Sequence, residues 1–134
     1  MVDADTIVAT LRELDLPNGH WAVHASAVMV LHGLIPDAGD IDVVARGPAW
    51  ARALELGAPK PGKQDLCVSL PSLGVEVWSG WLGEDLDALI DGAELVLGVP
   101  CVTLRDVLRF KERAGRPKDA PHAELLRRVL ERGG

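Results

Sequence analysis

The sequence predicts a small α/β (α+β) domain with a mixed β-sheet flanked by helices and a helical C-terminus. The chain of 134 residues fits one domain, covering residues 1–134, and its apolar and charged fractions of 48% and 25% are those of ordinary globular proteins. Segments whose apolar residues recur at helical spacing alternate with short apolar runs that are typical of strands. This alternation, followed by a final stretch without strand-like runs, is what indicates the class.

The N-terminal segment is expected to form a helix over residues 3–16, capped by Asp3 or Asp5. Its apolar stripe comprises Ile7, Val8, Leu11 and Leu14. A turn at residues 17–19 ends this helix, and a short strand follows over residues 20–25.

A short helix is predicted over residues 27–33, and the Ser26 side chain is placed to cap it. The next apolar run, residues 39–46, is expected to be a strand. A helix over residues 47–57 follows, with Pro48 in its first turn, where proline is tolerated.

The centre of the chain is rich in strand signals. Residues 59–63 are predicted to form a turn, and residues 65–70 and 74–78 two strands joined as a hairpin. Residues 84–91 form a weak, acidic helix pattern.

The C-terminal third begins with residues 93–102, which are expected to be a strand or an extended pair bent at Pro100. Thr103 is placed to cap a helix over residues 104–115. A last helix is expected to start late, because Pro117 and Pro121 interrupt its beginning.

Composition excludes several classes of function. The net charge of −6 argues against generic binding to nucleic acid or to an anionic membrane. No run approaches the ~20 apolar residues that span a bilayer, and the acidic N-terminus does not resemble a signal peptide, so a cytoplasmic location is expected. Cys67 and Cys101 each lie in an apolar run and are interpreted as reduced core residues, with a disulfide or metal role as the alternative.

Charge is divided unevenly along the chain. Residues 1–104 carry 5 Lys and Arg against 15 Asp and Glu, whereas residues 105–134 carry 9 against 5. An acidic body with a basic C-terminal segment suits a site that holds a cation on one side and phosphates on the other. The alternative is that these charges form ordinary ion pairs on solvated helix surfaces.

The run "GDIDVV" at residues 39–44 places two carboxylates two positions apart in an apolar strand. Because side chains alternate along a strand, Asp40 and Asp42 are expected on the same face. Two like charges there repel each other and are costly to desolvate, so a compensating group is expected. Divalent cations with hard oxygen ligands, such as Mg²⁺, provide that compensation.

Two further features accompany the aspartates. Glu76 lies in "GVEVW" with the same apolar–acid–apolar pattern and is a candidate third carboxylate, although a lone glutamate on a strand commonly faces solvent. The strand-to-helix turn at "HAS" points free backbone N–H groups outward, which suits phosphate oxygens. Phosphate beside carboxylate-bound Mg²⁺ is the arrangement expected for phosphoryl or nucleotidyl transfer.

The segment "HASAVMVLHGLIPDAGDIDVV" resembles the signature of the DNA polymerase β-like nucleotidyltransferase superfamily. That signature is a Gly-Gly or Gly-Ser turn, a short helix, and then apolar–acid–apolar–acid. The C-terminal "LRDVLRFKERAGRPKDAPHAELL" is similar to its small bacterial members, including those of abortive-infection and toxin–antitoxin systems. With "GVEVW", these segments cover about half of the chain in the family's order.

The resemblance implies a nucleotidyltransferase-like fold and a Mg²⁺-dependent nucleotidyltransferase, with Mn²⁺ as the alternative ion. Such an enzyme moves NMP from an NTP substrate to a hydroxyl of a protein, RNA or small-molecule acceptor. By this resemblance Asp40, Asp42 and Glu76 are the catalytic residues and the metal ligands. Glu76 would also orient and deprotonate the attacking hydroxyl.

The resemblance also assigns nucleotide-binding residues. Ala25 and Ser26 would hold the β- and γ-phosphates, and Lys111 would reach toward the triphosphate. Lys118 or Arg116 would assist. Asp119 is interpreted as a helix cap or salt-bridge partner.

Two positions differ from the family pattern, since Ala25 replaces a glycine and Glu76 replaces an aspartate. Ala25 and the short chain favour an alternative function, a catalytically degenerate member that acts by protein–protein contact as an antitoxin-like partner or homodimer. A metal-binding domain that hydrolyses phosphoesters is a third hypothesis. His24 is a candidate for a ligand or an acid/base group in the cleft, or for a local hydrogen bond. Trp78 and Trp81 are candidates for stacking a base or for closing the edge of the core.

Overall fold

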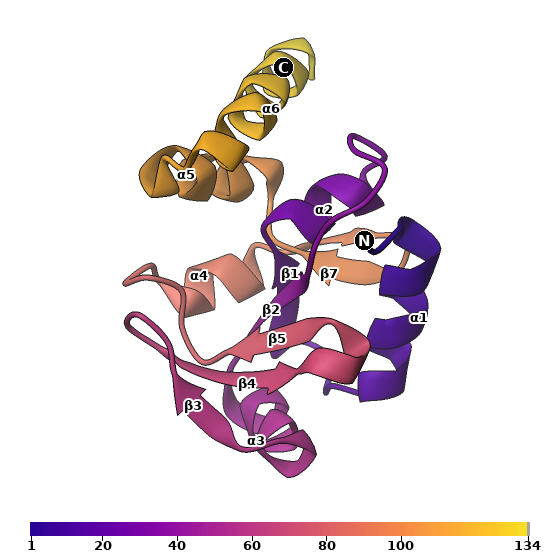
Figure 1. Cartoon of the computed structure of the whole chain (residues 1–134), viewed down its shortest axis with the longest axis vertical. Coiled ribbons are helices and arrows are strands. Elements are labelled where there is room, and N and C mark those ends of the chain that lie inside the picture. The colour runs from indigo at the N-terminus through magenta and orange to yellow at the C-terminus, as the bar shows by residue number, and fades with distance from the viewer. Residues whose placement is uncertain (134) are drawn as a thin grey trace.

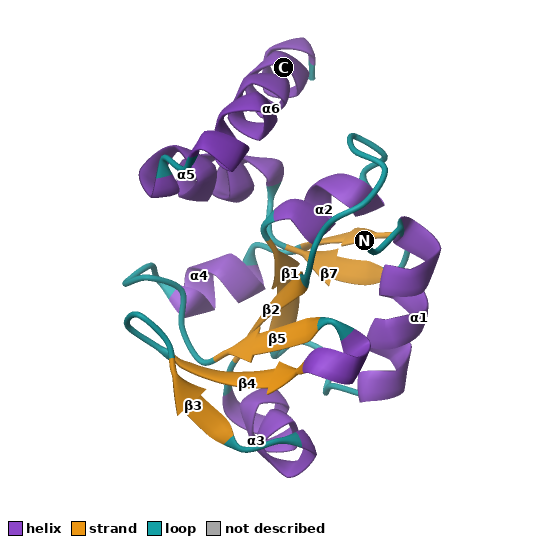
Figure 2. Cartoon of the chain, viewed as in Figure 1, coloured by secondary structure: helices purple, strands orange, loops and turns teal. Residues whose placement is uncertain are grey.

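The computed structural model describes residues 1–133 and contains a seven-stranded mixed sheet in the order β3-β4-β5-β2-β1-β7-β6, flanked by helices (Figures 1 and 2). The predicted class is therefore confirmed. The helices are α1 (Ala4–Leu14), α2 (Ser26–Leu31), α3 (Gly47–Leu56), α4 (Leu86–Asp91), α5 (Leu104–Ala114) and α6 (Ala120–Arg132). The strands are β1 (Trp21–His24), β2 (Ile41–Ala45), β3 (Pro59–Pro61), β4 (Leu66–Leu70), β5 (Val75–Trp78), β6 (Glu94–Val96) and β7 (Val99–Cys101). Two 3₁₀ turns, η1 (Pro71–Leu73) and η2 (Pro117–Asp119), complete the chain.

The centre of the sheet is formed by β1, β2 and β5. Strand β2 pairs antiparallel with β1 and parallel with β5, and β5 pairs antiparallel with β4. One cross-strand row is wholly apolar and buried, and it consists of Cys101, Val23, Val43, Val77 and Val68. This row forms the middle of the core.

The helices are fixed to the sheet by apolar faces and by a few ion pairs. Ile7, Leu11 and Leu14 form the buried face of α1, and Asp3 caps this helix by accepting a hydrogen bond from the Thr6 N–H. Arg46, which follows β2, reaches α4 and binds Asp87 at 2.7 Å and Asp91 at 2.6 Å.

The C-terminal helices form a separate layer beside α2. Helix α5 contacts α2 and α6, and α6 extends away from the sheet (Figure 1). Thr103 caps α5 as predicted, by accepting a hydrogen bond from the Asp106 N–H. Arg109 and Arg113 of α5 bind Glu84 ahead of α4, at 2.6 and 3.1 Å. These pairs favour the ion-pair interpretation of the basic segment.

Several local predictions were wrong. Residues 59–61 were expected in a turn but form the edge strand β3, because prolines are tolerated on a sheet edge. The bend in residues 93–102 lies at Leu97 and Gly98 rather than at Pro100. Both residues have positive φ, 53° and 78°, as a tight hairpin turn requires.

The two edges of the sheet differ in their backbone donors. Strand β3 has prolines at both ends, so Lys60 supplies its only backbone N–H. Strand β6 forms the opposite edge and contains no proline. Leu95 on β6 is 76% exposed, and Leu97 beyond it is 60% exposed.

Two compositional expectations also bear on the fold. Cys67 and Cys101 are buried free thiols, as predicted. In residues 1–133 no helix combines the length and apolar character needed to cross a membrane.

Candidate functional site

The candidate site is a polar cross-strand row on the sheet. It lies one residue along each strand from the apolar row. Strand pairing places His24 opposite Asp42, Asp42 opposite Glu76, and Glu76 opposite Ser69. Paired residues point to the same face, so Asp42 and Glu76 lie side by side. Of the three carboxylates predicted to converge, Asp42 and Glu76 are therefore neighbours in the backbone register.

Asp42 is a perturbed carboxyl group in this row. Burial, together with the negative charges of Glu76 and Asp40, raises its pKa to about 6. A hydrogen bond from the Trp78 Nε1–H to its Oδ1, at 3.3 Å, and the positive charge of Arg116 act in the opposite direction. An ionised Asp42 is thus costly to the fold in the absence of a cation.

Asp40 and Glu76 occupy less constrained positions. Asp40 is exposed and precedes β2, so it is outside the strand in which it was predicted. Glu76 is partly buried and accepts a weak hydrogen bond from the Cys67 thiol, with Sγ and Oε2 3.7 Å apart. Among residues 1–133 no three His, Cys, Asp or Glu side chains are arranged closely enough to hold a metal ion.

The turn between β1 and α2 has the backbone of a glycine turn. Ala25 adopts φ 61° and ψ −146°, a conformation that costs a non-glycine residue on the order of 1–3 kcal/mol. Its N–H donates to Nδ1 of His24 at 2.7 Å, so this donor does not face outward. The turn therefore has a glycine-type backbone although the residue at position 25 is alanine.

Ser26 does not cap α2 as predicted. It is the first residue of the helix, and Ala25 holds the cap position without a side-chain hydrogen bond. The Ser26 hydroxyl instead accepts a hydrogen bond of 2.9 Å from Nζ of Lys111 on α5. Two residues that are 85 positions apart in the sequence, both predicted as nucleotide ligands, are thus in contact.

A buried ion pair holds Lys111 in place. Its Nζ lies 3.2 Å from Oδ1 of Asp119, and both side chains are 2% exposed. Burial lowers the pKa of Lys111. Burial disfavours ionised Asp119, but hydrogen bonds from Arg116 and Lys111 outweigh this effect and lower its pKa. Asp119 is a salt-bridge partner, as expected, whereas Lys118 is exposed and forms no ion pair in the described part of the chain.

An aromatic cluster covers the inner end of the polar row. His24 stacks on Trp81 with ring centroids 4.3 Å apart and meets Phe110 edge-on at 5.6 Å. Burial, with the nearby charges of Arg109 and Lys111, lowers the pKa of His24 to about 3, so this imidazole is neutral. Its Nε2 and the indole nitrogen of Trp81 are buried without a partner among residues 1–133. Helical spacing on residues 104–115 gave no sign that Phe110 would join this cluster.

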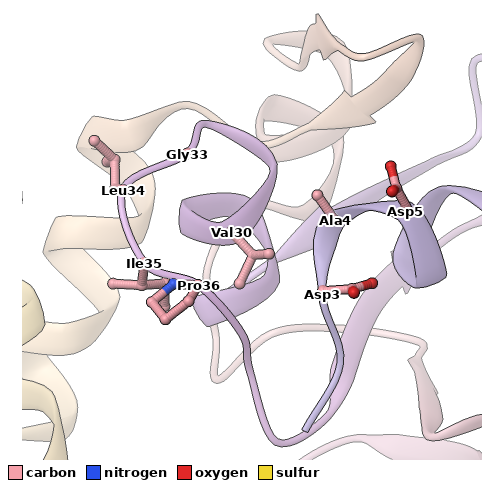
Figure 3. Close-up of a pocket in the computed structure, with 8 residues that line it drawn as sticks. All are labelled: Asp3, Ala4, Asp5, Val30, Gly33, Leu34, Ile35 and Pro36. Atoms are coloured by element: carbon pink, nitrogen blue, oxygen red, sulfur yellow. The ribbon is translucent and has the colours of Figure 1, made fainter.

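A cavity lies away from the polar row. It has a volume of about 540 Å³ and opens between the start of α1 and the loop after α2 (Figure 3). Asp3 and Asp5 border one side, and Val30, Ile35 and Pro36 border the other. None of the residues predicted for catalysis or nucleotide binding lines it.

Comparisons with protein-family models, with curated proteins and with solved structures gave no match.

Replacing the strained alanine should stabilise the turn. We expect Ala25→Gly to raise the free energy of unfolding by about 1 kcal/mol, because glycine adopts positive φ without a steric penalty. Urea denaturation followed by circular dichroism measures this change. Ala27→Gly, a matched change within α2, should instead lose about 1 kcal/mol. Equal losses in both variants would contradict the interpretation of residue 25.

Neutralising Asp42 should stabilise the protein in a pH-dependent way. Because the folded state holds the Asp42 proton more tightly than the unfolded chain, stability falls as the pH rises from about 4 through 6. We expect Asp42→Asn to be more stable than the unmodified protein by about 1–2 kcal/mol at pH 7.5, with the difference vanishing near pH 4.

Urea midpoints measured across this pH range test the Asp42 prediction. Asp5→Asn is the control, since it removes the same charge from an exposed side chain on α1. A stability gain that is independent of pH, or one shared by the control, would show that ionised Asp42 does not strain the fold.

The buried pair between Lys111 and Asp119 should show strong coupling. We expect Asp119→Leu to cost roughly 3–5 kcal/mol, because Lys111 would be left buried without its carboxylate. The double variant Lys111→Met, Asp119→Leu should be more stable than that single variant. Free energies of unfolding for the two singles and the double define the coupling, and additive effects would contradict it.

Proposed function

We propose that the protein is a Mg²⁺-dependent nucleotidyltransferase that moves NMP from an NTP to a hydroxyl group of a protein, RNA or small-molecule acceptor. The proposal rests on one observation above all. Asp42 and Glu76 are paired in register on adjacent strands, directly across from the strand end that leads into the Ala25–Ser26 turn. This is the order of carboxylates and turn that the sequence signature implies.

The donor chemistry of the site fits Mg²⁺. Carboxylate oxygens are the hard ligands that this ion prefers, and a cation would relieve the repulsion among Asp40, Asp42 and Glu76. Mg²⁺ is commonly bound through one or two carboxylates together with substrate phosphates and water. A site completed by the triphosphate is therefore compatible with the lack of a third converged side chain in residues 1–133.

Each residue of the chain would have a distinct part in the transfer. When bound, Mg²⁺ would supply charge neutralisation at the phosphates. Asp42 and Asp40 would orient the triphosphate by holding its ion, and Glu76 would accept the proton of the attacking hydroxyl. The Ala25–Ser26 turn would face the terminal phosphates, with Lys111 adding positive charge behind Ser26 and Lys118 reaching in from η2.

One observation favours a second candidate function, contact with another protein without catalysis. The Ala25 N–H is already bonded to His24, so the turn has one backbone donor fewer for phosphate oxygens. A degenerate member of the superfamily would act as an antitoxin-like partner or as a homodimer. For either function we propose a cytoplasmic location, which accords with two free, buried thiols.

Calorimetric titration with Mg²⁺ or Mn²⁺, with and without a nonhydrolysable NTP, tests the enzyme proposal. We expect the metal to bind more tightly when the nucleotide is present, because its phosphates complete the ligand set. A metal affinity that is the same with and without the nucleotide would point to phosphoester hydrolysis. Lack of any binding would contradict both metal-dependent functions and leave the protein-contact function.

The same experiment has matched variants. Asp42→Ala should abolish metal binding and transfer of label from each radiolabelled NTP, whereas Asp5→Ala on α1 should change neither. A partner that co-purifies with unchanged affinity after Asp40→Ala and Asp42→Ala would support the contact function instead.

A further inference from the structure

Trp78 is the only residue within positions 1–133 whose side chain donates a hydrogen bond to Asp42. The two lie on adjacent strands, with Trp78 opposite Val44 and therefore two residues along from the Asp42–Glu76 pair. Its Nε1 reaches back along the sheet to Oδ1 of Asp42, at 3.3 Å. This bond leaves Oδ2 of Asp42 without a side-chain donor in the same part of the chain.

The indole of Trp78 is seated by two loops. Gly62 lies so close to it that a Cβ there would be 2.5 Å from Cζ3 of Trp78. The Gly62 N–H donates to the Asp65 carbonyl at 2.8 Å, and the Asp65 carboxylate accepts a 3.0 Å hydrogen bond from the Leu82 N–H. Trp81 meets the indole edge-on, with centroids 6.2 Å apart. The position of the ring is thus determined by its surroundings.

We propose that Trp78 is a positioning residue that fixes the Asp42 carboxylate so that its Oδ2 can bind a divalent cation. This inference rests on the proposed function. A ligating carboxylate usually has its second oxygen hydrogen-bonded to an outer residue, and loss of such a residue costs 10–100-fold in metal affinity. A hydrogen bond to the ionised carboxylate also favours the form that binds metal. The loops that seat the indole accordingly contribute to the metal site without touching the ion.

The opposite role would be a gate, in which the Trp78 N–H competes with the cation for Asp42. The two roles differ in the sign of one measurement. Removing the N–H weakens cation binding if Trp78 positions Asp42, and strengthens it if Trp78 blocks Asp42.

Mn²⁺ alone is the probe, titrated at pH 8 and followed by electron paramagnetic resonance of the free ion. We expect Trp78→Phe to lower the Mn²⁺ affinity about 10–100-fold while its unfolding midpoint stays close to that of the unmodified protein. Trp50→Phe, a change of the same kind on α3, should leave the affinity unchanged. Equal or tighter binding by Trp78→Phe would overturn the positioning role but leave the proposed enzyme standing. Failure of the unmodified protein to bind Mn²⁺ both alone and with a nonhydrolysable NTP would overturn both.

Two further measurements avoid any dependence on the folding of Trp78→Phe. Gly62→Ala should also weaken Mn²⁺ binding, because the added Cβ must displace either the indole or the loop that seats it. In the unmodified protein, Mn²⁺ should broaden the indole N–H resonance of Trp78 at lower concentrations than those of Trp21 and Trp50. Normal affinity in Gly62→Ala with its indole resonance displaced, or uniform broadening of all three resonances, would overturn the proposal.

Discussion

The hydrogen-bonded register of the central strands is the constraint on which this molecule depends. It aligns an apolar row from Cys101 through Val43 to Val68, and one residue further a polar row from His24 through Asp42 to Ser69. A slip of one residue would move every side chain of a strand to the other face. The core and the candidate site are therefore specified together. A one-residue slip in the pairing of β2 would therefore place Asp42 in the core and a valine in the site.

The site also joins parts of the chain that the sheet alone would not bring together. The β1–α2 turn and the strands β2 and β5 belong to the sheet region, whereas Lys111 and Asp119 belong to the C-terminal helices. The contact between Lys111 and Ser26 connects the two layers, and Asp119 compensates the buried charge. A buried ion pair contributes little net stability, but an arrangement that separates its partners leaves an uncompensated buried charge and is strongly destabilised. The Lys111–Asp119 pair thus acts mainly to fix where α5 sits against the turn.

Sequence reasoning recovered the features that depend on local periodicity. The alternation in "GDIDVV" and "GVEVW" placed Asp42 and Glu76 on strands, and the strand register then made them neighbours. It failed where geometry across elements decides the outcome. Ser26 looked like a cap because its residue type suits one, but the turn at Ala25 places it inside the helix. The reach of Trp78 to Asp42, and of Phe110 to His24, depends on side-chain directions that no spacing rule encodes. Residues 59–61 have a composition that is typical of turns, and only their pairing with β4 makes them a strand.

The contrast between the two sheet edges limits how copies of this chain could associate. An exposed edge strand can template the addition of another strand, and prolines suppress that addition. Strand β3 contains a single backbone N–H, whereas each residue of β6 has one, and in both strands pairing with the inner neighbour leaves only alternate groups to face outward. The β3 edge is therefore the poorer template for a further strand. Two copies joined through β6 would leave only their proline-containing β3 edges outside, which disfavours further growth by edge pairing.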